Sequence, residues 1–170
     1  MNKKDLRLLI IRIVLGCLIL LNLFAIFRFS SQTGTVSEQT SAQISDIVAD
    51  AVVDDYQEKD EPEKIEIRKS FDLMVRKTAH LLEFGALGSL IFLLLLTWKI
   101  HLGFQYAGAL FSVLIVAVID EMLLQGAVDG RAALWQDVLI DLIGAAVCCT
   151  VILLIVLLAR VFKKLKMGAH

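Results

Sequence analysis

The stretch DEMLLQGAVDGRAALWQDVLID, residues 120–141, decides the fold, because it places charged side chains between two strongly apolar runs. These runs cover residues 104–119 and 134–159. A bilayer core about 30 Å thick needs roughly 20 apolar residues for one helical crossing. The second run is long enough, and the first becomes so when its flanks are included. The stretch therefore predicts a polar turn that joins two membrane helices.

Two more apolar runs, residues 8–27 and 79–98, complete the set of membrane spans. The chain has 170 residues, of which 58% are hydrophobic, and its mean hydropathy is +0.75. It is too apolar for an ordinary soluble domain and too short for a second bundle. The first run exceeds the apolar core of a signal peptide, and no small-residue cleavage site follows it. We therefore expect one all-α integral membrane domain, residues 1–170, with four transmembrane helices and a retained first helix.

The composition argues against several classes of protein. A net charge of −1 gives no electrostatic footprint for nucleic acid. The cysteines, Cys17, Cys148 and Cys149, all lie inside apolar runs, and their spacing fits neither a disulfide framework nor a CxxC metal motif. We expect no cofactor and no nucleic-acid partner.

The lysines and arginines indicate which side of the membrane each end occupies. Cytoplasmic segments of membrane proteins carry an excess of these residues. They gather around the first helix and in the C-terminal tail, at Lys3, Lys4, Arg7, Arg12, Arg160, Lys163, Lys164 and Lys166. Segment 28–78 holds nearly as many, but we give more weight to the dense ends. Both termini are therefore predicted to be cytoplasmic, which places segment 28–78 and turn 120–133 outside.

The outer segment 35–75 is predicted to be helical. Its sequence TVSE, residues 35–38, matches a capping box, in which a threonine begins a helix and a glutamate follows three residues later. Beyond it, apolar residues recur at helical spacing: Ile44, Ile47, Val48, Ala51 and Val52. Their face is expected to rest on the bundle or on lipid headgroups, with a docked partner protein as the alternative. Pro62 suits the first position of a second helix, which leads through Ile67, Phe71 and Met74 into the membrane.

Ionisable residues are predicted to converge at the outer ends of three membrane helices. Arg76, His80 and Glu83 are spaced i, i+4, i+7, so one helical face carries all three. In the last helix, Asp137 and Asp141 share a face in the same way. The cluster is completed by residues at and beyond the end of the third helix: Asp120, Glu121, Gln125 and Arg131.

Three interpretations of this cluster remain open. Buried ion pairs can hold membrane helices in register, and small residues at Gly85, Gly88, Gly144 and Ala145 would let those helices approach closely. The charges can instead form a ligand-binding or catalytic site, because ionisable residues inside a membrane are costly and are functional candidates by default. A metal site is the third interpretation: HLLE, residues 80–83, offers a histidine and a glutamate, but no second nitrogen or thiolate accompanies them.

The second interpretation assigns candidate roles. The catalytic candidates are His80, Glu83, Asp120 and Glu121, and the ligand-binding candidates are Arg76, Lys77, Gln125, Arg131, Asp137 and Asp141. His80 beside Glu83 has the chemistry of an oriented acid–base pair, and the cationic side chains suit a phosphate or carboxylate. No convincing nucleophile accompanies them, so whether the protein is an enzyme stays open. Any reaction would be histidine-assisted attack by water or by a substrate hydroxyl.

Three sequence blocks resemble the VanZ-like family of bacterial membrane proteins. They are FRFSSQTGTVSEQTS (27–41), VRKTAHLLEFGALG (75–88) and DEMLLQGAVDGRAALWQDVLIDLIGA (120–145). The residues that match the family's motifs are Lys77, His80, Glu83, Phe84, Asp120, Glu121, Gln125, Gly130, Arg131, Asp137, Asp141 and Gly144. Family members often have a histidine after the Asp-Glu pair and a proline before Gly-Arg. This chain has Leu123 and Asp129 near those places, and one extra residue precedes Gln125.

The resemblance implies a multi-pass protein of the bacterial cytoplasmic membrane, related to one associated with resistance to the glycopeptide antibiotic teicoplanin. Its implied function is to bind or modify a lipid-linked or amphiphilic ligand at the outer surface and so to alter glycopeptide susceptibility. The implied partners are a membrane lipid, a lipid-linked cell-wall precursor or a lipoglycopeptide antibiotic. The alternative is a non-catalytic structural or partner-binding protein whose buried charges only hold the helices together.

Overall fold

The computed structural model describes residues 2–128 and 134–168. The helices are α1 (Lys3–Ser30), α2 (Gly34–Val52), α3 (Glu61–Leu95), α4 (Leu102–Ile119) and α5 (Trp135–Gly168). Short turns of 3-10 helix cover Tyr56–Glu58 and Gln125–Ala127, and a π-helical turn covers Asp120–Leu124. Four segments are long and apolar enough to cross a membrane: Lys3–Ser30, Glu61–Leu95, Leu102–Ala127 and Trp135–Met167. The predicted all-α membrane architecture is therefore confirmed.

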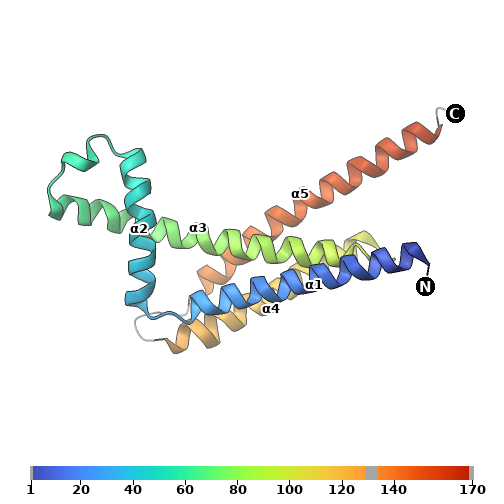
Figure 1. Ribbon diagram of the computed structural model, residues 1–170, viewed down its shortest axis with the longest axis horizontal. Helices are drawn as coiled ribbons and strands as arrows, with labels where there is room; N and C mark the ends of the chain where they lie inside the picture. The colour runs from blue at the N-terminus through green and yellow to red at the C-terminus, as the bar shows by residue number, and fades with distance from the viewer. Residues whose placement is uncertain (1, 129–133, 169–170) are drawn as a thin grey trace.

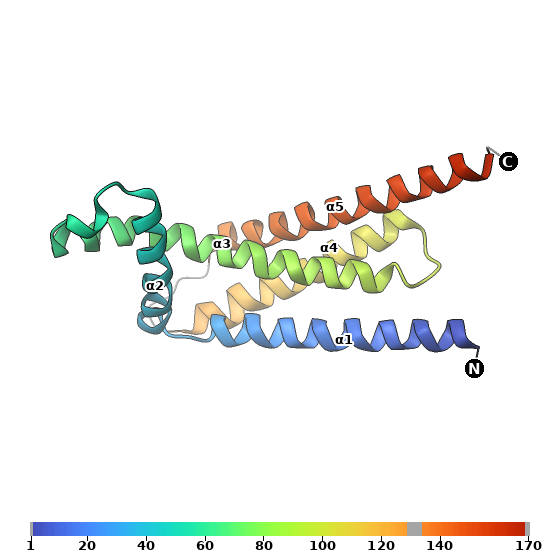
Figure 2. The same ribbon diagram turned by 45° about the horizontal axis from the view of Figure 1, so that its top comes forward.

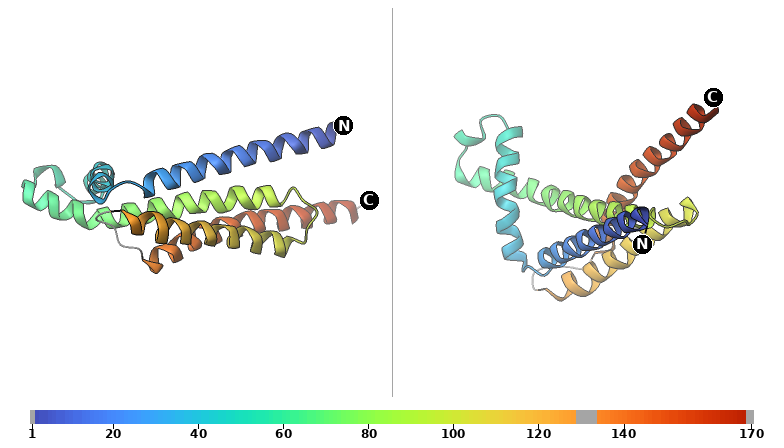
Figure 3. Two further views of the ribbon diagram at one scale, coloured as in Figure 1. Left: turned by 90° about the horizontal axis from the view of Figure 1, so that it is seen from below. Right: turned by 45° about the vertical axis from the view of Figure 1, so that its right-hand side comes forward.

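The four long segments run along the length of the molecule, and α2 lies across one end of them (Figure 1). Both termini lie at the opposite end, as Figure 2 shows. We call these two ends of the bundle the α2 end and the terminal end. α3 is central, because it contacts each of the other helices, whereas α5 diverges from α1 toward its C-terminus (Figure 3). The apolar core between the helices includes Ile26, Phe84, Leu87, Val113 and Val138.

Small residues let α3 and α5 pack closely together. A Cβ atom added to Gly88 would lie 2.8 Å from the Cβ of Ala145, and one added to Gly144 would collide with the backbone carbonyl of Leu81. Contacts this close are available only to small side chains at a helix–helix interface. The expectation that glycines bring the second and fourth membrane helices together is confirmed, and the contact holds the charged residues of α3 against those of α5.

α2 packs against α3 through a stripe of small side chains. The buried members of this stripe are four residues apart: Ser37, Ser41, Ser45 and Ala49. The apolar residues lie elsewhere on α2, where Ile47 is 71% exposed and Ile44 is 49% exposed. The apolar face of α2 therefore does not pack on the bundle, and contact of this face with lipid headgroups stays a prediction. Small side chains bring the α2 backbone close enough to α3 for polar groups of the two helices to meet, which bulky Ile and Val would prevent.

Polar bonds fasten α2 to α3. Arg68 Nε donates a hydrogen bond to Asp46 Oδ1 over 2.8 Å, and the hydroxyl of Tyr56 donates to the same oxygen over 2.6 Å. Nearer the bundle, the hydroxyl of Ser41 donates to the carboxylate of Asp72. These bonds fix α2 across the end of the bundle.

The first turns of α2 and α3 differ slightly from expectation. α2 begins at Gly34, and the side chain of its N-cap residue Thr33 makes no capping hydrogen bond. Thr35 therefore lies inside the first turn, with its hydroxyl 3.2 Å from that of Thr33. The capping box expected at Thr35 is not formed, because the helix has already begun. Pro62 lies in the first turn of α3, one position later than expected, and the helix continues unbroken into the bundle.

Candidate functional site

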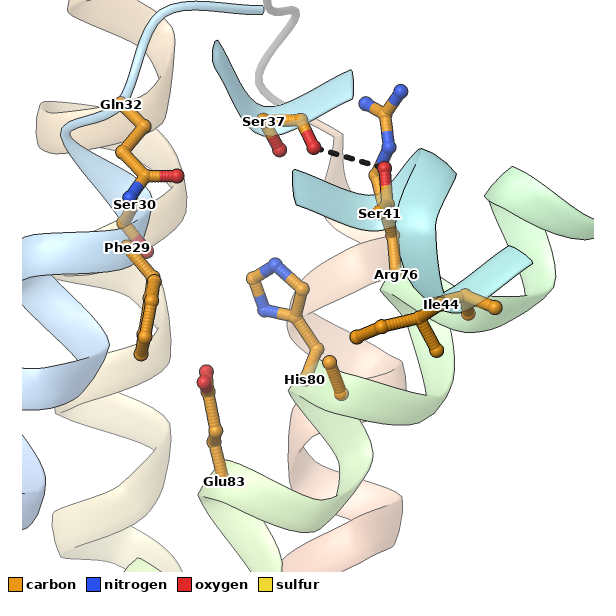
Figure 4. Close-up of a pocket in the computed structure, with 11 residues that line it drawn as sticks. Phe29, Ser30, Gln32, Ser37, Ser41, Ile44, Arg76, His80 and Glu83 are labelled. Carbon is orange, nitrogen blue, oxygen red and sulfur yellow. Dashed lines mark hydrogen bonds between the residues drawn. The ribbon is translucent and has the colours of Figure 1, made fainter. Parts of the chain in front are cut away.

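A cavity of about 260 Å³ lies at the α2 end, between the end of α1, α2 and α3 (Figure 4). Its lining consists of Phe29, Ser30, Gln32, Ser37, Ser41, Ile44, Val75, Arg76, Ala79, His80 and Glu83. α3 contributes Arg76, His80 and Glu83 from one face, as their spacing predicts. The structure therefore brings three of the candidate residues to one hollow in the molecule.

His80 and Glu83 both project into this cavity (Figure 4). His80 Nδ1 lies 3.4 Å from Oδ1 of Asp141, a fully buried residue of α5. On its other side, the His80 ring stacks on Phe84 with centroids 6.3 Å apart and planes 9° from parallel. The Asp141 carboxylate and the phenyl ring therefore both lie next to the imidazole. Glu83 is different, since no described residue forms a hydrogen bond or an ion pair with its carboxylate.

A buried network occupies the end of α4. Ser30 Oγ donates to Asp120 Oδ2 over 2.7 Å, and Gln125 Nε2 donates to the same oxygen over 3.1 Å. The Gln125 amide also donates to Glu121 Oε2 over 2.6 Å, and the backbone N–H of Leu134 donates to Glu121 Oε1 over 2.9 Å. Asp120, Glu121 and Gln125 are all buried. Both carboxyl groups act as acceptors in these hydrogen bonds.

The π-helical turn Asp120–Leu124 explains how this network forms. Such a turn takes up one residue more than an α-helical turn and occurs often at functional sites. The turn ends directly before Gln125, whose amide reaches both carboxylates.

The remaining candidates pair close to the cavity. Lys77 Nζ lies 3.4 Å from Asp137 Oδ1, which links α3 to α5 outside the cavity lining. Arg76 forms an ion pair with Asp72, the residue that also accepts from Ser41. Arg131 and Gly130 lie outside the described residues.

The ionisable groups converge as the sequence predicts. His80 lies within electrostatic range of Asp141, Glu83 and Asp120, which belong to three different segments of the chain. In residues 2–128 and 134–168, no three histidine, cysteine or acidic side chains meet closely enough to hold a metal ion. The arrangement offers an oriented imidazole, a carboxylate without a bonded partner and several hydroxyl groups. These groups suit ligand binding and proton transfer.

Sequence reasoning missed the half of the cavity that α1 and α2 supply. These residues are Phe29, Ser30, Gln32, Ser37, Ser41 and Ile44. Most of them belong to the block at residues 27–41, but their side chains carry no charge and therefore do not stand out in an apolar chain. The four-residue spacing of the serines was the available signal. Asp72, the partner of Arg76, was missed because it lies one turn before the charged motif.

Comparison with known proteins identifies the family. The model of the VanZ/LLP1 family matches residues 14–162, a range that includes the whole cavity and the buried network. No curated protein and no solved structure matches the chain. The match agrees with the three sequence blocks and with the membrane architecture. The chain therefore belongs to the VanZ/LLP1 family.

Proposed function

We propose that this protein lies in the bacterial cytoplasmic membrane and that its cavity binds or modifies a lipid-linked or amphiphilic ligand at the outer leaflet, which alters susceptibility to teicoplanin-type glycopeptides. The observation that carries the proposal is the cavity itself. His80 and Glu83 project into it from a membrane helix, where ionisable side chains are costly and are therefore candidates for a functional site.

The distribution of basic residues supports the orientation. Arg7 and Arg12 on α1 lie at the terminal end, together with the basic C-terminal tail of α5. Basic residues concentrate on the cytoplasmic side of membrane proteins. With both termini in the cytoplasm, the α2 end and its cavity face outward.

The lining of the cavity supports an amphiphilic ligand. Phe29, Ile44 and Val75 supply apolar surface beside the polar His80 and Glu83. A pocket for a drug-sized molecule has a volume of about 300–1,000 Å³. At about 260 Å³, this cavity suits the headgroup of a lipid or lipid-linked precursor better than an entire glycopeptide.

The test is the teicoplanin susceptibility of a bacterial host that expresses the protein. His80→Gln is expected to return susceptibility to that of the host without the protein, while expression and melting temperature stay close to those of the unaltered chain. His101→Gln is the matched control, because His101 lies at the start of α4 at the terminal end, and it should leave susceptibility unchanged. A fully active His80→Gln variant would refute the proposal.

Mass spectrometry of envelope lipids and wall fragments separates binding from modification. A new or missing species in cells that express the protein, absent with His80→Gln, would indicate a reaction. Identical profiles would assign the protein a binding role without catalysis.

A structural role is the competing proposal, and specific contacts favour it. Lys77 pairs with Asp137 and His80 with Asp141, so charges connect α3 to α5 at two points. Gly88 and Ala145 bring the same helices together. If the charges serve only to join helices, His80→Gln should lower the melting temperature or the amount of protein, and susceptibility should change in proportion.

A further inference from the structure

We propose that the ligand's headgroup carries a protonated primary amine and that Glu83 is its counter-ion in the cavity. This inference rests on the proposed function, because it names the chemistry of a ligand for the same site. Three observations support it. Glu83 has no bonded partner among the described residues, buried carboxylates lie near it, and the rest of the cavity lining is uncharged apart from Arg76 and His80.

Glu83 is poised to bind a cation. Its carboxylate points into the cavity (Figure 4), and no group in the described part of the chain forms a hydrogen bond or ion pair with it. A carboxylate in a membrane helix needs such a partner, because desolvating an isolated charge is very costly. An ammonium group supplies a positive charge and three N–H donors in the space that the cavity provides.

Behind the cavity lining, the buried residues around Glu83 include several carboxylates. Asp120, Glu121 and Asp141 are almost fully buried, and Asp120 and Asp141 lie within electrostatic range of Glu83. Asp120 accepts a hydrogen bond from Ser30, and Glu121 accepts hydrogen bonds from Gln125 and Leu134. Among residues 2–128 and 134–168, these carboxylates outnumber the single imidazole of His80 even when it is protonated. Their negative potential attracts a cation to the part of the cavity beside Glu83 and repels a phosphate or carboxylate from it.

The two cations that the structure describes near the cavity, Lys77 and Arg76, do not reverse this potential. Lys77 is held by Asp137 and does not line the cavity. Arg76 lines it but forms an ion pair with Asp72, so much of its charge is compensated. The guanidinium stands one turn from His80, farther along α3 from Glu83. It is therefore placed for a phosphate that follows the amine in a zwitterionic headgroup.

The uncharged lining completes a site for an amine. Phe29 presents an aromatic ring, and aromatic faces attract ammonium groups. The hydroxyls of Ser30, Ser37 and Ser41 add oxygen acceptors along the α1 and α2 walls. Ile44, which is half exposed, provides an apolar border toward which acyl chains can extend.

The experiment compares two lipids that differ only in the amine. Dioleoyl phosphatidylethanolamine and its N-acetyl derivative share phosphate and acyl chains, but acetylation removes the positive charge. Binding of each to the full-length protein in detergent is measured by native mass spectrometry. The unaltered protein should bind the free amine at least about tenfold more tightly, as expected for a hydrogen-bonded charge pair.

Two variants assign that preference to Glu83. Glu83→Gln keeps the shape of the side chain and should abolish the preference. Glu66→Gln makes the same change at an exposed position of α3 outside the cavity and should retain it. Should Glu83→Gln fail to fold, Phe29→Leu serves instead, because it removes the aromatic face, keeps apolar bulk and should reduce the preference several-fold.

The possible outcomes separate this inference from the proposed function. Equal binding of both lipids, or a preference that survives Glu83→Gln, overturns the ammonium site and leaves an amphiphile-binding cavity. Failure of both lipids to bind overturns the ammonium site, and the susceptibility of the His80→Gln variant then tests the proposed function by itself. Phosphoethanolamine without acyl chains is the last probe. If it competes as well as the lipid does, the ammonium site stands and the ligand is a soluble amine.

Discussion

The two ends of the bundle contain similar polar side chains but satisfy them differently. At the terminal end, Arg12 donates hydrogen bonds to the hydroxyl and the carbonyl oxygen of Thr97, over 3.0 and 2.9 Å, and its guanidinium lies 4.6 Å from the ring centroid of Trp98. Gln105 donates in the same region to the carbonyl oxygens of Leu95 and Trp98. Each of these polar groups meets a neutral partner within the protein.

At the α2 end, charged side chains pair with one another, and the carboxylate of Glu83 has no bonded partner among the described residues. Lys77 pairs with Asp137, His80 lies beside Asp141, and Glu83 has no bonded partner among the residues that the structure describes. Buried polar groups are costly at either end. At the terminal end, hydrogen bonds within the protein offset that cost. At the α2 end, Glu83 is left for a ligand to bind. The comparison therefore separates polar residues that stabilise the fold from polar residues available to a ligand.

The largest loss of stability is expected from a substitution that separates α3 from α5. Gly144→Ala places a Cβ against the backbone carbonyl of Leu81, which cannot move aside as a flexible side chain would. We expect a loss of about 2–3 kcal/mol in the free energy of unfolding. Gly16→Ala is the matched control, because an added Cβ there meets nothing within 4 Å, and it should leave stability equal or slightly higher. Thermal unfolding followed by tryptophan fluorescence measures both variants.

Removal of Arg12 is expected to affect stability alone. Arg12→Gln loses the bidentate contact with Thr97 and the stacking on Trp98, which should cost about 1–2 kcal/mol. Lipid preference should be unchanged, since this region lies at the far end of the bundle. Glu83→Gln should show the reverse pattern, with altered preference and little loss of stability. If Arg12→Gln changes the lipid preference as much as Glu83→Gln does, the functional separation of the two ends is wrong.

A smaller loss is expected when α1 is released from the buried network. Ser30→Ala removes the donor that reaches Asp120 and should lower stability by about 1 kcal/mol, because Gln125 still donates to the same oxygen. Ser89→Ala is a suitable control, since its hydroxyl bonds only to the Gly85 carbonyl of its own helix. Equal melting temperatures for the two variants would show that the network does not depend on α1.

Helical periodicity and apolar length are sufficient to predict the four membrane segments and the convergence of the ionisable residues. Arg76, His80 and Glu83 share a face because of their spacing alone, and Asp141 meets them because glycines bring α5 against α3. The shared face depends on one helix, and the close approach depends on one helix–helix contact. Both can therefore be predicted from the sequence without knowledge of the rest of the fold.

The burial of α2 was not predictable in the same way. Hydrophobicity favours Ile44 and Ile47 as the buried face, but Ser41 and Ser45 are buried instead. The choice depends on how near two backbones can come and which polar groups then meet, and these quantities belong to the tertiary structure. The cavity walls on α1 and α2 were missed for the same reason. The four-residue spacing of the serines shows that they share one face of α2, but which partner that face meets depends on where the helix is placed.

The smallest predicted effect concerns the attachment of α2, outside the membrane spans. The hydrogen bond to Asp46 and burial raise the pKa of Tyr56 above its ordinary value near 10, and Arg68 opposes part of that rise. The bond therefore contributes fully to stability below pH 10. This contribution is lost as the pH rises from the pKa of Tyr56 in the unfolded chain to its higher pKa in the folded protein, because the unfolded chain releases the proton first. The melting temperature should fall slightly as the pH rises above about 10.

Tyr56→Phe should remove that pH-dependent part of the stability and cost about 0.5–1 kcal/mol at neutral pH. Tyr106→Phe is the control, because its hydroxyl lies 2.9 Å from Thr150 Oγ1 and has no carboxylate partner there. Hydrogen exchange in α2 is the more direct measurement. Tyr56→Phe should speed exchange in α2 and leave α4 unchanged, since the lost bond joins α2 to the 3-10 turn Tyr56–Glu58 and involves no residue of α4. If exchange in both helices rises together, α2 unfolds only with the entire bundle, and the α2 end is as cooperative as the terminal end.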